Sequence, residues 1–352
     1  MRQIPIAAYP PAYDNRSCYR LVRSMTTDAV ISQEIVMKAL QFDQFGSPDV
    51  IVLRDVAQPE PGPGQIRIAV RVCGLTPADW HVVDGLLADH LPPLPRGLGL
   101  EVAGTVDALG EGVTGVRIGD RVFGPAAFDG PTAGAAEFAL MPAWARIPEG
   151  VTDEQAAALP MAAETAWRAL DDLGVQPGEL LLVHGAGTTV GEAAVRIALH
   201  RGIRVIATAG PTRAAALRES GAQVTTYGEG MTERVSTLTP GPVDRALDAT
   251  PTGGRIDRAD RPSPAGGSLP ALIELTGDPD RVLTVSDFAA AAELGVRITT
   301  EIRYDQMNEF ARLAGEGILV VPVARTYTLE QVQEAAKLSQ SRRPGGKLML
   351  VL

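Results

Sequence analysis

The first third of the chain contains short runs in which hydrophobic and polar positions alternate. Residues 65–72, Gln-Ile-Arg-Ile-Ala-Val-Arg-Val, are the clearest run, and the Pro-Gly-Pro-Gly stretch at 61–64 and the Pro-Pro pair at 92–93 punctuate this region. Alternation with a period of two, bounded by turn residues, is typical of antiparallel strands with one solvated face. Residues 37–138 are therefore predicted to form a small barrel or sandwich.

The pattern changes after residue 152. The stretch 152–173, rich in Ala and Leu, predicts a helix, and residues 179–184 form a continuous apolar strand. A glycine-containing turn, an Ala-rich helix over 192–200 and a second apolar strand over 204–208 follow. This order predicts a βαβ unit whose parallel strands are buried on both faces. Further predicted elements are strands near 243–247, 281–285, 295–299 and 318–323, an exposed loop over 255–268, and a helix near 329–339.

Composition and charge narrow the classes of protein that fit. The 352 residues carry 32 Lys and Arg against 42 Asp and Glu, so the formal net charge is 32 − 42 = −10. An acidic chain without a dense basic run argues against a nucleic-acid partner. No stretch approaches the roughly 18 consecutive apolar residues of a membrane-spanning helix, so no membrane partner is expected.

The cysteine count limits the chemistry further. Only Cys18 and Cys73 are present, which excludes a disulfide framework and a four-thiolate zinc site. A reducing, cytoplasmic location is expected.

A glycine turn lies between the predicted strand 179–184 and the helix 192–200. It reads Gly185-Ala186-Gly187-Thr188-Thr189-Val190-Gly191. Dinucleotide sites need small residues at such a turn because the backbone approaches the pyrophosphate and the helix N-terminus stabilises its charge. The βαβ placement makes nucleotide binding the favoured interpretation over a purely structural turn.

The end of the second strand of this unit bears on the choice of cofactor. An NAD site usually has Asp or Glu there, which binds the ribose 2′-hydroxyl, whereas a 2′-phosphate needs a basic residue. This chain has Thr208-Ala209-Gly210-Pro211-Thr212-Arg213, with no acid and with an arginine. NADPH is therefore the expected cofactor. The alternative for Arg213 is a solvated residue in the first turn of the next helix.

Several motifs in order resemble one known family. They are Gly74-Leu75-Thr76-Pro77-Ala78-Asp79-Trp80, Gly99-Leu100-Glu101-Val102-Ala103-Gly104, Gly119-Asp120-Arg121-Val122-Phe123-Gly124, Ala158-Leu159-Pro160 with Thr165-Ala166, the glycine turn, and Gly346-Lys347. From residue 37 to 352 the chain resembles the zinc-independent quinone oxidoreductase branch of the medium-chain dehydrogenase/reductase superfamily.

The resemblance implies an α/β fold with two domains. A GroES-like β-barrel domain, of the chaperonin-10 type, is expected over 37–160 and 305–352, because the last strands return to it in such proteins. A doubly wound Rossmann domain that binds NADP is expected over 161–304. Residues 1–36 are expected to be a poorly ordered extension that belongs to neither domain.

The resemblance also bears on metal binding. Zinc-dependent relatives have a Cys where this chain has Thr76 and a His where it has Leu100, and neither residue can supply such a ligand. Cys73 is interpreted as a buried strand thiol, and His81 and His90 lack partners at ligand spacing. No metal is expected.

The chemistry that remains is direct hydride transfer from the nicotinamide to an electron-poor acceptor, whose carbonyl oxygen then needs a hydrogen-bond donor. The candidates are Thr76, Asp79, Trp80 and Thr165. By resemblance, Thr165 lies near the nicotinamide and Thr76 lines the substrate cleft. Asp79 has a structural alternative as the cap of a turn. Trp80 either stacks on a flat acceptor or fills the domain junction.

Glu164, beside Thr165, is a further option. It is a proton donor if burial raises its pKa, and has no role if it faces solvent.

The resemblance assigns ten residues to the cofactor. Gly187, Thr188, Thr189, Val190 and Gly191 are expected at the pyrophosphate, Thr208, Arg213 and Tyr227 around the adenine ribose phosphate, and Thr250 and Ser286 near the nicotinamide ribose. Quinone oxidoreductases commonly have two glycines at 188–189, so the threonine hydroxyls are expected to donate to phosphate oxygens instead. For the residues at strand ends, the alternative is a hydroxyl that is satisfied locally.

Three functions remain open at this point. The first is an NADPH-dependent oxidoreductase that reduces a quinone or an activated alkene or carbonyl, with a small electrophilic molecule as its partner. The second is an enoyl reductase that acts on a carrier-bound biosynthetic intermediate. The third is a cofactor-binding scaffold whose redox activity has been lost or repurposed. Dimerisation is usual among such relatives, and the sequence does not decide whether this chain forms a homodimer.

Overall fold

The computed structural model describes residues 35–86, 88, 91, 93–251, 267–299, 301–341 and 344–352. Most of the predicted extension at 1–36, His90, and most of the predicted loop at 255–268 lie outside the described residues. No described helix is long and apolar enough to cross a membrane.

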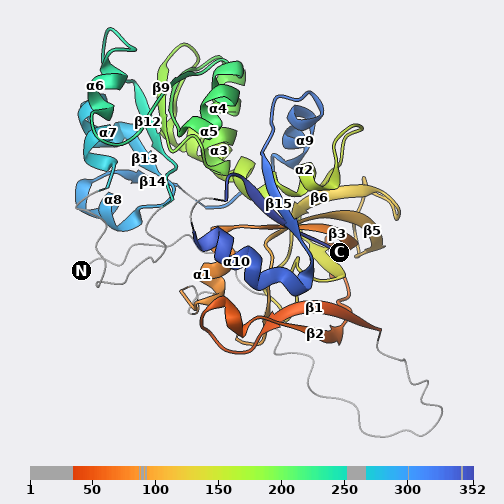
Figure 1. The fold of residues 1–352 in the computed structure, drawn as a ribbon. Coiled ribbons are helices and arrows are strands. Elements are labelled where there is room, and N and C mark those ends of the chain that lie inside the picture. The colour runs from red at the N-terminus through yellow and green to blue at the C-terminus, as the bar shows by residue number, and fades with distance from the viewer. Residues whose placement is uncertain are drawn as a thin grey trace, which may run out of the picture.

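Two sheets, antiparallel except for one pair of strands, form the GroES-like part of the chain, which lies at the lower right of Figure 1. One has the order β2-β1-β4, and the other has the order β15-β16-β3-β5-β6-β8, with β7 also paired to β3. Strands β15 and β16, from the C-terminal end, run parallel to each other and join this sheet through β3. The strands are β1 (Val36–Phe42), β2 (Val52–Ala57), β3 (Ile66–Leu75), β4 (Arg96–Gly97), β5 (Glu101–Leu109), β6 (Arg121–Pro125), β7 (Phe138–Met141), β8 (Ala145–Arg146), β15 (Val323–Tyr327) and β16 (Lys347–Val351).

Strand β3 departs from the predicted pattern of one wet face. Eight of its ten residues are buried. It is central in its sheet, where it pairs with β5, β7 and β16, and helix α2 (Asp153–Ala157) packs against it. Arg67, which the alternation places on a wet face, is 9% exposed and forms ion pairs with Glu60 and Asp107. Coverage from both sides therefore overrides the alternation.

The predicted helix over 152–173 is two helices. Helix α2 ends at Ala157 and α3 (Pro160–Leu173) begins at Pro160. Proline lacks an N–H and is tolerated in the first turn but not inside a helix, so a new helix starts there. The other helices of the GroES-like part are α1 (Pro77–Val83), α9 (Met307–Gly315) and α10 (Val332–Gln340), with 3₁₀ turns η1 (Pro48–Val50) and η4 (Leu329–Gln331).

A six-stranded parallel sheet forms the Rossmann-type part, at the upper left of Figure 1. Its order is β11-β10-β9-β12-β13-β14, so the strand order reverses between β9 and β12, where doubly wound sheets bind ligands. The strands are β9 (Leu180–His184), β10 (Arg204–Thr208), β11 (Gln223–Thr225), β12 (Arg245–Asp248), β13 (Val282–Thr284) and β14 (Arg297–Ile298). The helices are α4 (Thr189–His200), α5 (Pro211–Glu219), α6 (Met231–Ser236), α7 (Leu269–Thr276) and α8 (Phe288–Leu294), with a 3₁₀ turn η3 (Pro279–Arg281).

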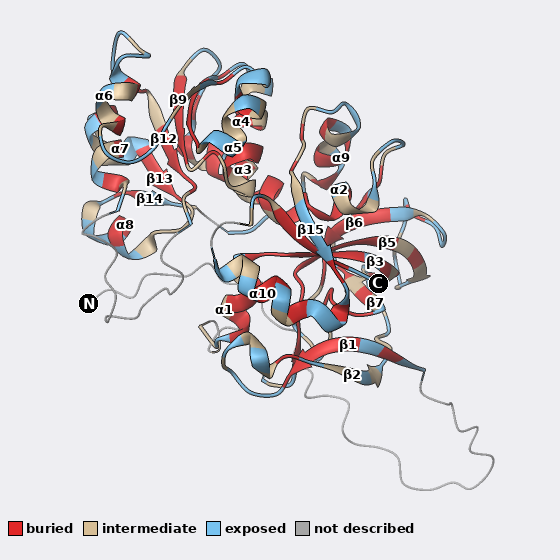
Figure 2. Ribbon diagram, viewed as in Figure 1, coloured by how far each residue is buried: buried red, intermediate tan, exposed pale blue. Residues whose placement is uncertain are grey.

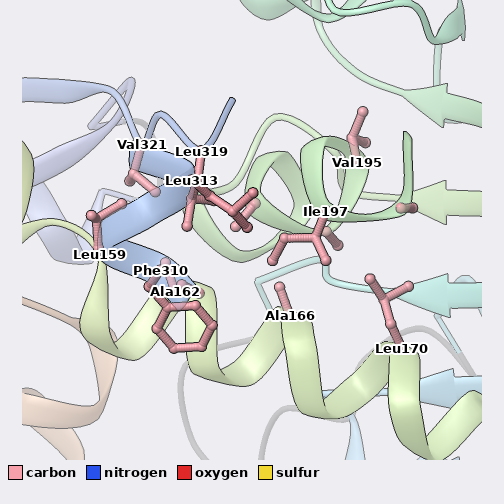
Figure 3. Close-up of a cluster of buried hydrophobic side chains, with 14 of the residues drawn as sticks. Leu159, Ala162, Ala166, Leu170, Val195, Ile197, Phe310, Leu313, Leu319 and Val321 are labelled. Carbon is pink, nitrogen blue, oxygen red and sulfur yellow. The ribbon is translucent and has the colours of Figure 1, made fainter. Parts of the chain in front are cut away.

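One hydrophobic cluster joins the two parts of the chain. Figure 3 shows its centre, where side chains of α3, α4 and α9 meet. The same cluster contains Val72 and Phe123 of the barrel strands and Leu181 and Val183 of β9. In Figure 2 the central strands β9, β12 and β13 are buried, while helices such as α4 and α5 also carry exposed residues. Helix α3 thus connects both sheets through apolar contacts, and this places its side chains at the junction.

Candidate active site

Thr76 and Asp79 form a reciprocal cap at the start of α1. The Asp79 carboxylate accepts hydrogen bonds from the Thr76 N–H at 2.6 Å and from the Thr76 hydroxyl at 3.0 Å. Its other oxygen accepts from the N–H of Gly99 at 3.0 Å. Asp79 is 1% exposed. This arrangement supports the structural alternative for Asp79, and it engages the one hydroxyl proton of Thr76.

Burial gives Asp79 an unusual pKa. Desolvation raises the pKa of its carboxyl to about 6, although the hydrogen bonds from Thr76 lower it. The nearby charges of Glu101 and Lys347 act in opposite directions on it. At pH 7, which is above this pKa, Asp79 is therefore mainly ionised. The hydrogen bonds that its carboxylate accepts offset only part of the cost of burying this charge.

Trp80 belongs to the hydrophobic core of the GroES-like part. It is 6% exposed, and its indole N–H donates to the hydroxyl of Ser339 in α10 at 2.7 Å. A buried indole that is bonded on its polar edge has no face free for an acceptor. The structure therefore supports the packing alternative for Trp80.

A buried ion pair between β16 and β5 lies against the start of α3. Lys347 of β16 pairs with Glu101 of β5, and both side chains are nearly inaccessible, at 4% and 0%. Glu101 lies opposite Gly74 of β3 and accepts a hydrogen bond from the N–H of Met161 at 2.9 Å. These contacts hold the first turn of α3 against the strand that leads to Thr76.

Thr165 lies one turn further along α3. It is four residues after Met161 and therefore on the same side of the helix, and it is half-buried. Its neighbour Glu164 is 2% exposed and pairs with Arg168 at 2.7 Å, and it accepts from the N–H of Arg303 at 2.8 Å. With these donors in place, Glu164 is an acceptor in an ion pair and does not fit the role of proton donor.

The positions that correspond to zinc ligands do not fit a metal. Thr76 donates to Asp79, and Leu100 is a buried apolar residue. Burial raises the pKa of the Cys73 thiol well above its usual range, which disfavours the thiolate that a metal needs. Within the described ranges, no group of three or more His, Cys, Asp and Glu side chains is placed to hold a metal ion.

The glycine turn lies at the N-terminus of α4, and Thr188 caps this helix. The Thr188 hydroxyl accepts from the N–H of Gly191 at 3.0 Å and lies 3.0 Å from two carbonyl oxygens, those of Gly185 and Ala249. This differs from the expectation that the hydroxyl donates to phosphate, because its single proton already has backbone acceptors. The N–H groups of Thr189 and Val190 are in the first turn, where a helix offers no partner of its own.

Hydroxyls at the carboxyl ends of the parallel strands are satisfied locally. Thr208 is fully buried, where it contacts Nδ1 of His184 at 2.7 Å and accepts from the N–H of Gly185. The Thr250 hydroxyl donates to Asp248 at 2.7 Å, and that of Ser286 donates to the carbonyl of Thr250 at 2.7 Å. The local alternative therefore describes these three hydroxyls, which support the loops around the glycine turn.

Arg213 lies beside the glycine turn, and Tyr227 lies beside Gly210, just before α5. A Cβ on Gly187 would be 3.5 Å from Cγ of Arg213, and a Cβ on Gly210 would be 3.5 Å from the hydroxyl of Tyr227. Tyr227 is 57% exposed. Of the residues expected around the adenine ribose phosphate, Thr208 is fully buried and the Arg213 side chain is 20% exposed.

The turn has the features that a dinucleotide requires. Gly185 has a φ of +78°, and a Cβ on Gly191 would lie 2.3 Å from the carbonyl oxygen of Gly185, so both positions need glycine. Nε of Arg213 is buried and has no hydrogen-bond partner among the described residues. The residues present therefore fit a nucleotide diphosphate at the N-terminus of α4.

Comparisons with known proteins agree with this geometry. Residues 62–150 match the family described as the alcohol dehydrogenase GroES-like domain, and residues 220–350 match the zinc-binding dehydrogenase family. The structure of the quinone oxidoreductase from Coxiella burnetii covers 90% of this chain and is itself covered completely, with a TM-score of 0.73 and 27% identity. The chain belongs to the medium-chain dehydrogenase/reductase superfamily.

Two curated relatives of this dehydrogenase/reductase chain are informative. Human quinone oxidoreductase is 37% identical over 179 residues, which are 50% of this chain and 53% of that protein. The polyketide synthase GfsB from Streptomyces halstedii is 47% identical over 161 residues, which are 45% of this chain and 3% of that protein. The chain thus spans about half the length of the quinone oxidoreductase and a small part of the synthase.

Membership of the dehydrogenase/reductase superfamily confirms the predicted family and the predicted fold class. The chain is an oxidoreductase-family protein with a GroES-like part and a dinucleotide-binding part of the kind that takes NAD or NADP.

Sequence reasoning missed Glu192, which is 1% exposed in the first turn of α4 and pairs with Arg196 and Arg213. An acid on the buried face of an Ala-rich helix was the available signal. The pair of Glu101 and Lys347 was likewise not predicted, because these residues are far apart in the sequence.

Proposed function

We propose that this chain is an NADPH-dependent oxidoreductase that reduces a quinone or an α,β-unsaturated carbonyl compound by direct hydride transfer. The observation that carries the proposal is the position of Arg213 beside Gly187 of the glycine turn, with Tyr227 beside Gly210 after β10. No acidic residue occurs from Thr208 to Arg213, where an NAD site would place one. A basic side chain at that place favours a 2′-phosphate.

The proposal does not use a metal. Thr76 and Leu100 stand at the positions of zinc ligands, and neither side chain is a zinc ligand. Metal emission analysis of the purified protein should therefore return well below one equivalent of zinc. One equivalent that is retained through dialysis would contradict this part of the proposal.

The residues of the chain supply position and polarisation. When bound, a reduced nicotinamide supplies the hydride. The Thr165 hydroxyl, half-buried on α3 and four residues after Met161, is proposed to donate a hydrogen bond to the acceptor's carbonyl oxygen as negative charge develops there. The Thr76 hydroxyl donates to Asp79, so Thr76 is proposed to shape the cleft and not to donate to the acceptor.

A second candidate has its own support. The 47% identity with a segment of a polyketide synthase favours an acceptor of the kind such synthases handle. An α,β-unsaturated thioester on a carrier arm has the same electronic requirement as an enone, because hydride again adds to carbon while charge moves to a carbonyl oxygen. The two candidates differ in the size of the acceptor and not in the chemistry of the site.

The deciding experiment is a titration with NADPH that follows nicotinamide fluorescence. Binding at tens of micromolar or tighter is expected, and no binding in that range would overturn both reductase candidates. NADPH oxidation is then measured with a quinone, with a simple enone and with an α,β-unsaturated thioester of N-acetylcysteamine. Oxidation with the thioester alone would favour the second candidate. Binding without oxidation of any acceptor would indicate a cofactor-binding scaffold.

A further inference from the structure

Glu192 is a buried acid at the edge of the proposed cofactor site. It lies in the first turn of α4, directly after the glycine turn, and its side chain is 1% exposed. A buried carboxylate is costly unless it is paired and hydrogen-bonded. Here each carboxylate oxygen is taken by a different arginine. Oε1 accepts from Nη2 of Arg196 at 3.1 Å and from its Nε at 3.3 Å, while Oε2 contacts Nη2 of Arg213.

Arg213 reaches this carboxylate from the neighbouring βα unit. It belongs to the first turn of α5, and its side chain passes beside Gly187 on the way to Glu192. Its guanidinium therefore contacts a buried side chain in the first turn of α4, and its buried Nε is left without a hydrogen-bond partner among the described residues. The residue proposed to recognise the 2′-phosphate is thus already engaged by an acid of the chain itself.

Glu192 lowers the positive charge of this cluster. Two arginines and one glutamate give a net charge of +1, whereas the arginines without Glu192 would give +2. A guanidinium binds phosphate best through two parallel N–H groups. With Nη2 engaged by Glu192, Arg213 has to share this group or exchange it before it can hold a phosphate in that way.

We propose that Glu192 is an internal counter-ion that competes with the 2′-phosphate of NADPH for Arg213 and so reduces the preference for NADPH over NADH. This inference rests on the proposed NADPH-dependent function. NADH has a 2′-hydroxyl in place of the phosphate and does not need the guanidinium. The competition therefore acts on one dinucleotide and leaves the other nearly unaffected, which makes Glu192 a residue that sets cofactor specificity.

The test is the substitution Glu192→Gln, which removes the charge but keeps the shape. Dissociation constants for NADPH and NADH are measured by nicotinamide fluorescence at fixed salt. We expect about tenfold tighter binding of NADPH, the size of one charge-assisted hydrogen bond. NADH should change by less than about twofold. The salt dependence of NADPH binding should become steeper, because the site gains one net positive charge.

Two controls make the result specific. Glu219→Gln removes the same charge from an exposed position of α5 and should leave both constants unchanged. In the double variant E192Q/R213A the gain for NADPH should disappear, because the freed arginine is absent. Glu192→Leu is the second variant in case E192Q folds poorly, since an apolar side chain suits a buried position and Arg196, at 17% exposure, still reaches solvent.

The outcomes separate this inference from the proposed function. If the wild-type chain binds neither dinucleotide, the proposed function is wrong. If it binds NADPH and E192Q and E192L leave that affinity unchanged or weaken it, the competition is wrong and Glu192 positions Arg213 or only supports the fold. Equal tightening of NADPH and NADH would also overturn the inference, because it would show a general effect on the pyrophosphate.

Discussion

The carboxylate of Asp79 accepts hydrogen bonds from both the N–H and the hydroxyl of Thr76, over 2.6 and 3.0 Å. A third bond, from the N–H of Gly99, ties the start of α1 to the segment that leads into β5. Two of the four residues that the sequence offered as catalytic candidates thus bind each other. These hydrogen bonds hold the start of α1 after β3 in place.

The buried carboxyl of Asp79 should give the stability of the protein a specific pH dependence. Its pKa is raised from 3.8 to about 6, so the folded state favours the protonated form more than the unfolded state does. The associated stability is fully present below about pH 4 and is lost as the pH rises through 6. The wild type should lose on the order of 3 kcal/mol relative to Asp79→Asn across this window.

Chemical denaturation at several pH values between 4 and 7.5 measures this difference. The exposed Asp129→Asn variant should keep the wild-type pH dependence. Parallel stability curves for the wild type and D79N would show that Asp79 does not titrate in this window.

The ion pair between Lys347 and Glu101 should be costly to break on one side. Glu101 is fully buried, so Lys347→Met leaves a buried carboxylate without its cation and should destabilise the protein by about 3–5 kcal/mol. The double variant K347M/E101Q should recover most of this loss, because neither charge remains. Thermal and denaturant unfolding measure both variants.

The exposed pair of Lys38 and Asp55 is the matched control. These side chains are 50% and 62% exposed, so Lys38→Met should cost less than about 1 kcal/mol. A loss in K347M no larger than that in K38M would contradict the structural role assigned to the buried pair.

Thr188 should contribute to stability as the cap of α4. Thr188→Ala removes the hydroxyl that accepts from the N–H of Gly191 and should cost about 0.5–2 kcal/mol in unfolding free energy. Thr188→Ser keeps the hydroxyl and should stay close to the wild type. Equal losses in the two variants would show that the methyl group, and not the cap, matters at this position.

Thr165 should affect turnover without affecting cofactor affinity. Thr165→Val keeps the shape but removes the hydroxyl proposed to polarise the acceptor, and turnover should fall about 10²-fold, as when a single oxyanion donor is lost. The dissociation constant for NADPH should remain within about twofold of the wild type. Thr165→Ser should restore most of the turnover. Full activity in T165V would exclude Thr165 as the donor.

The sequence alone determined the features that depend on short stretches of chain. The turn from Gly185 to Gly191 needs glycine because of a positive φ and a close backbone approach, and both constraints act within seven residues. The parallel strands likewise follow from apolar runs, whereas the break between α2 and α3 at Pro160 was not predicted, although the proline that causes it is a local signal. The resemblance to a known family also led us to expect that the last strands return to the first domain. Strands β15 and β16 join the sheet that contains β3.

Only the tertiary structure decided which charged groups meet. Glu192 and Arg213 are 21 residues apart and lie on successive helices, and they meet because β9 and β10 pair as parallel neighbours. Lys347 reaches Glu101 because β16 and β5 flank β3 in the same sheet. Strand order and burial set these contacts, and periodicity along the chain carries no record of them. For this reason, the sequence indicated a cofactor site with an arginine, while the fold showed that the arginine already has an acidic partner.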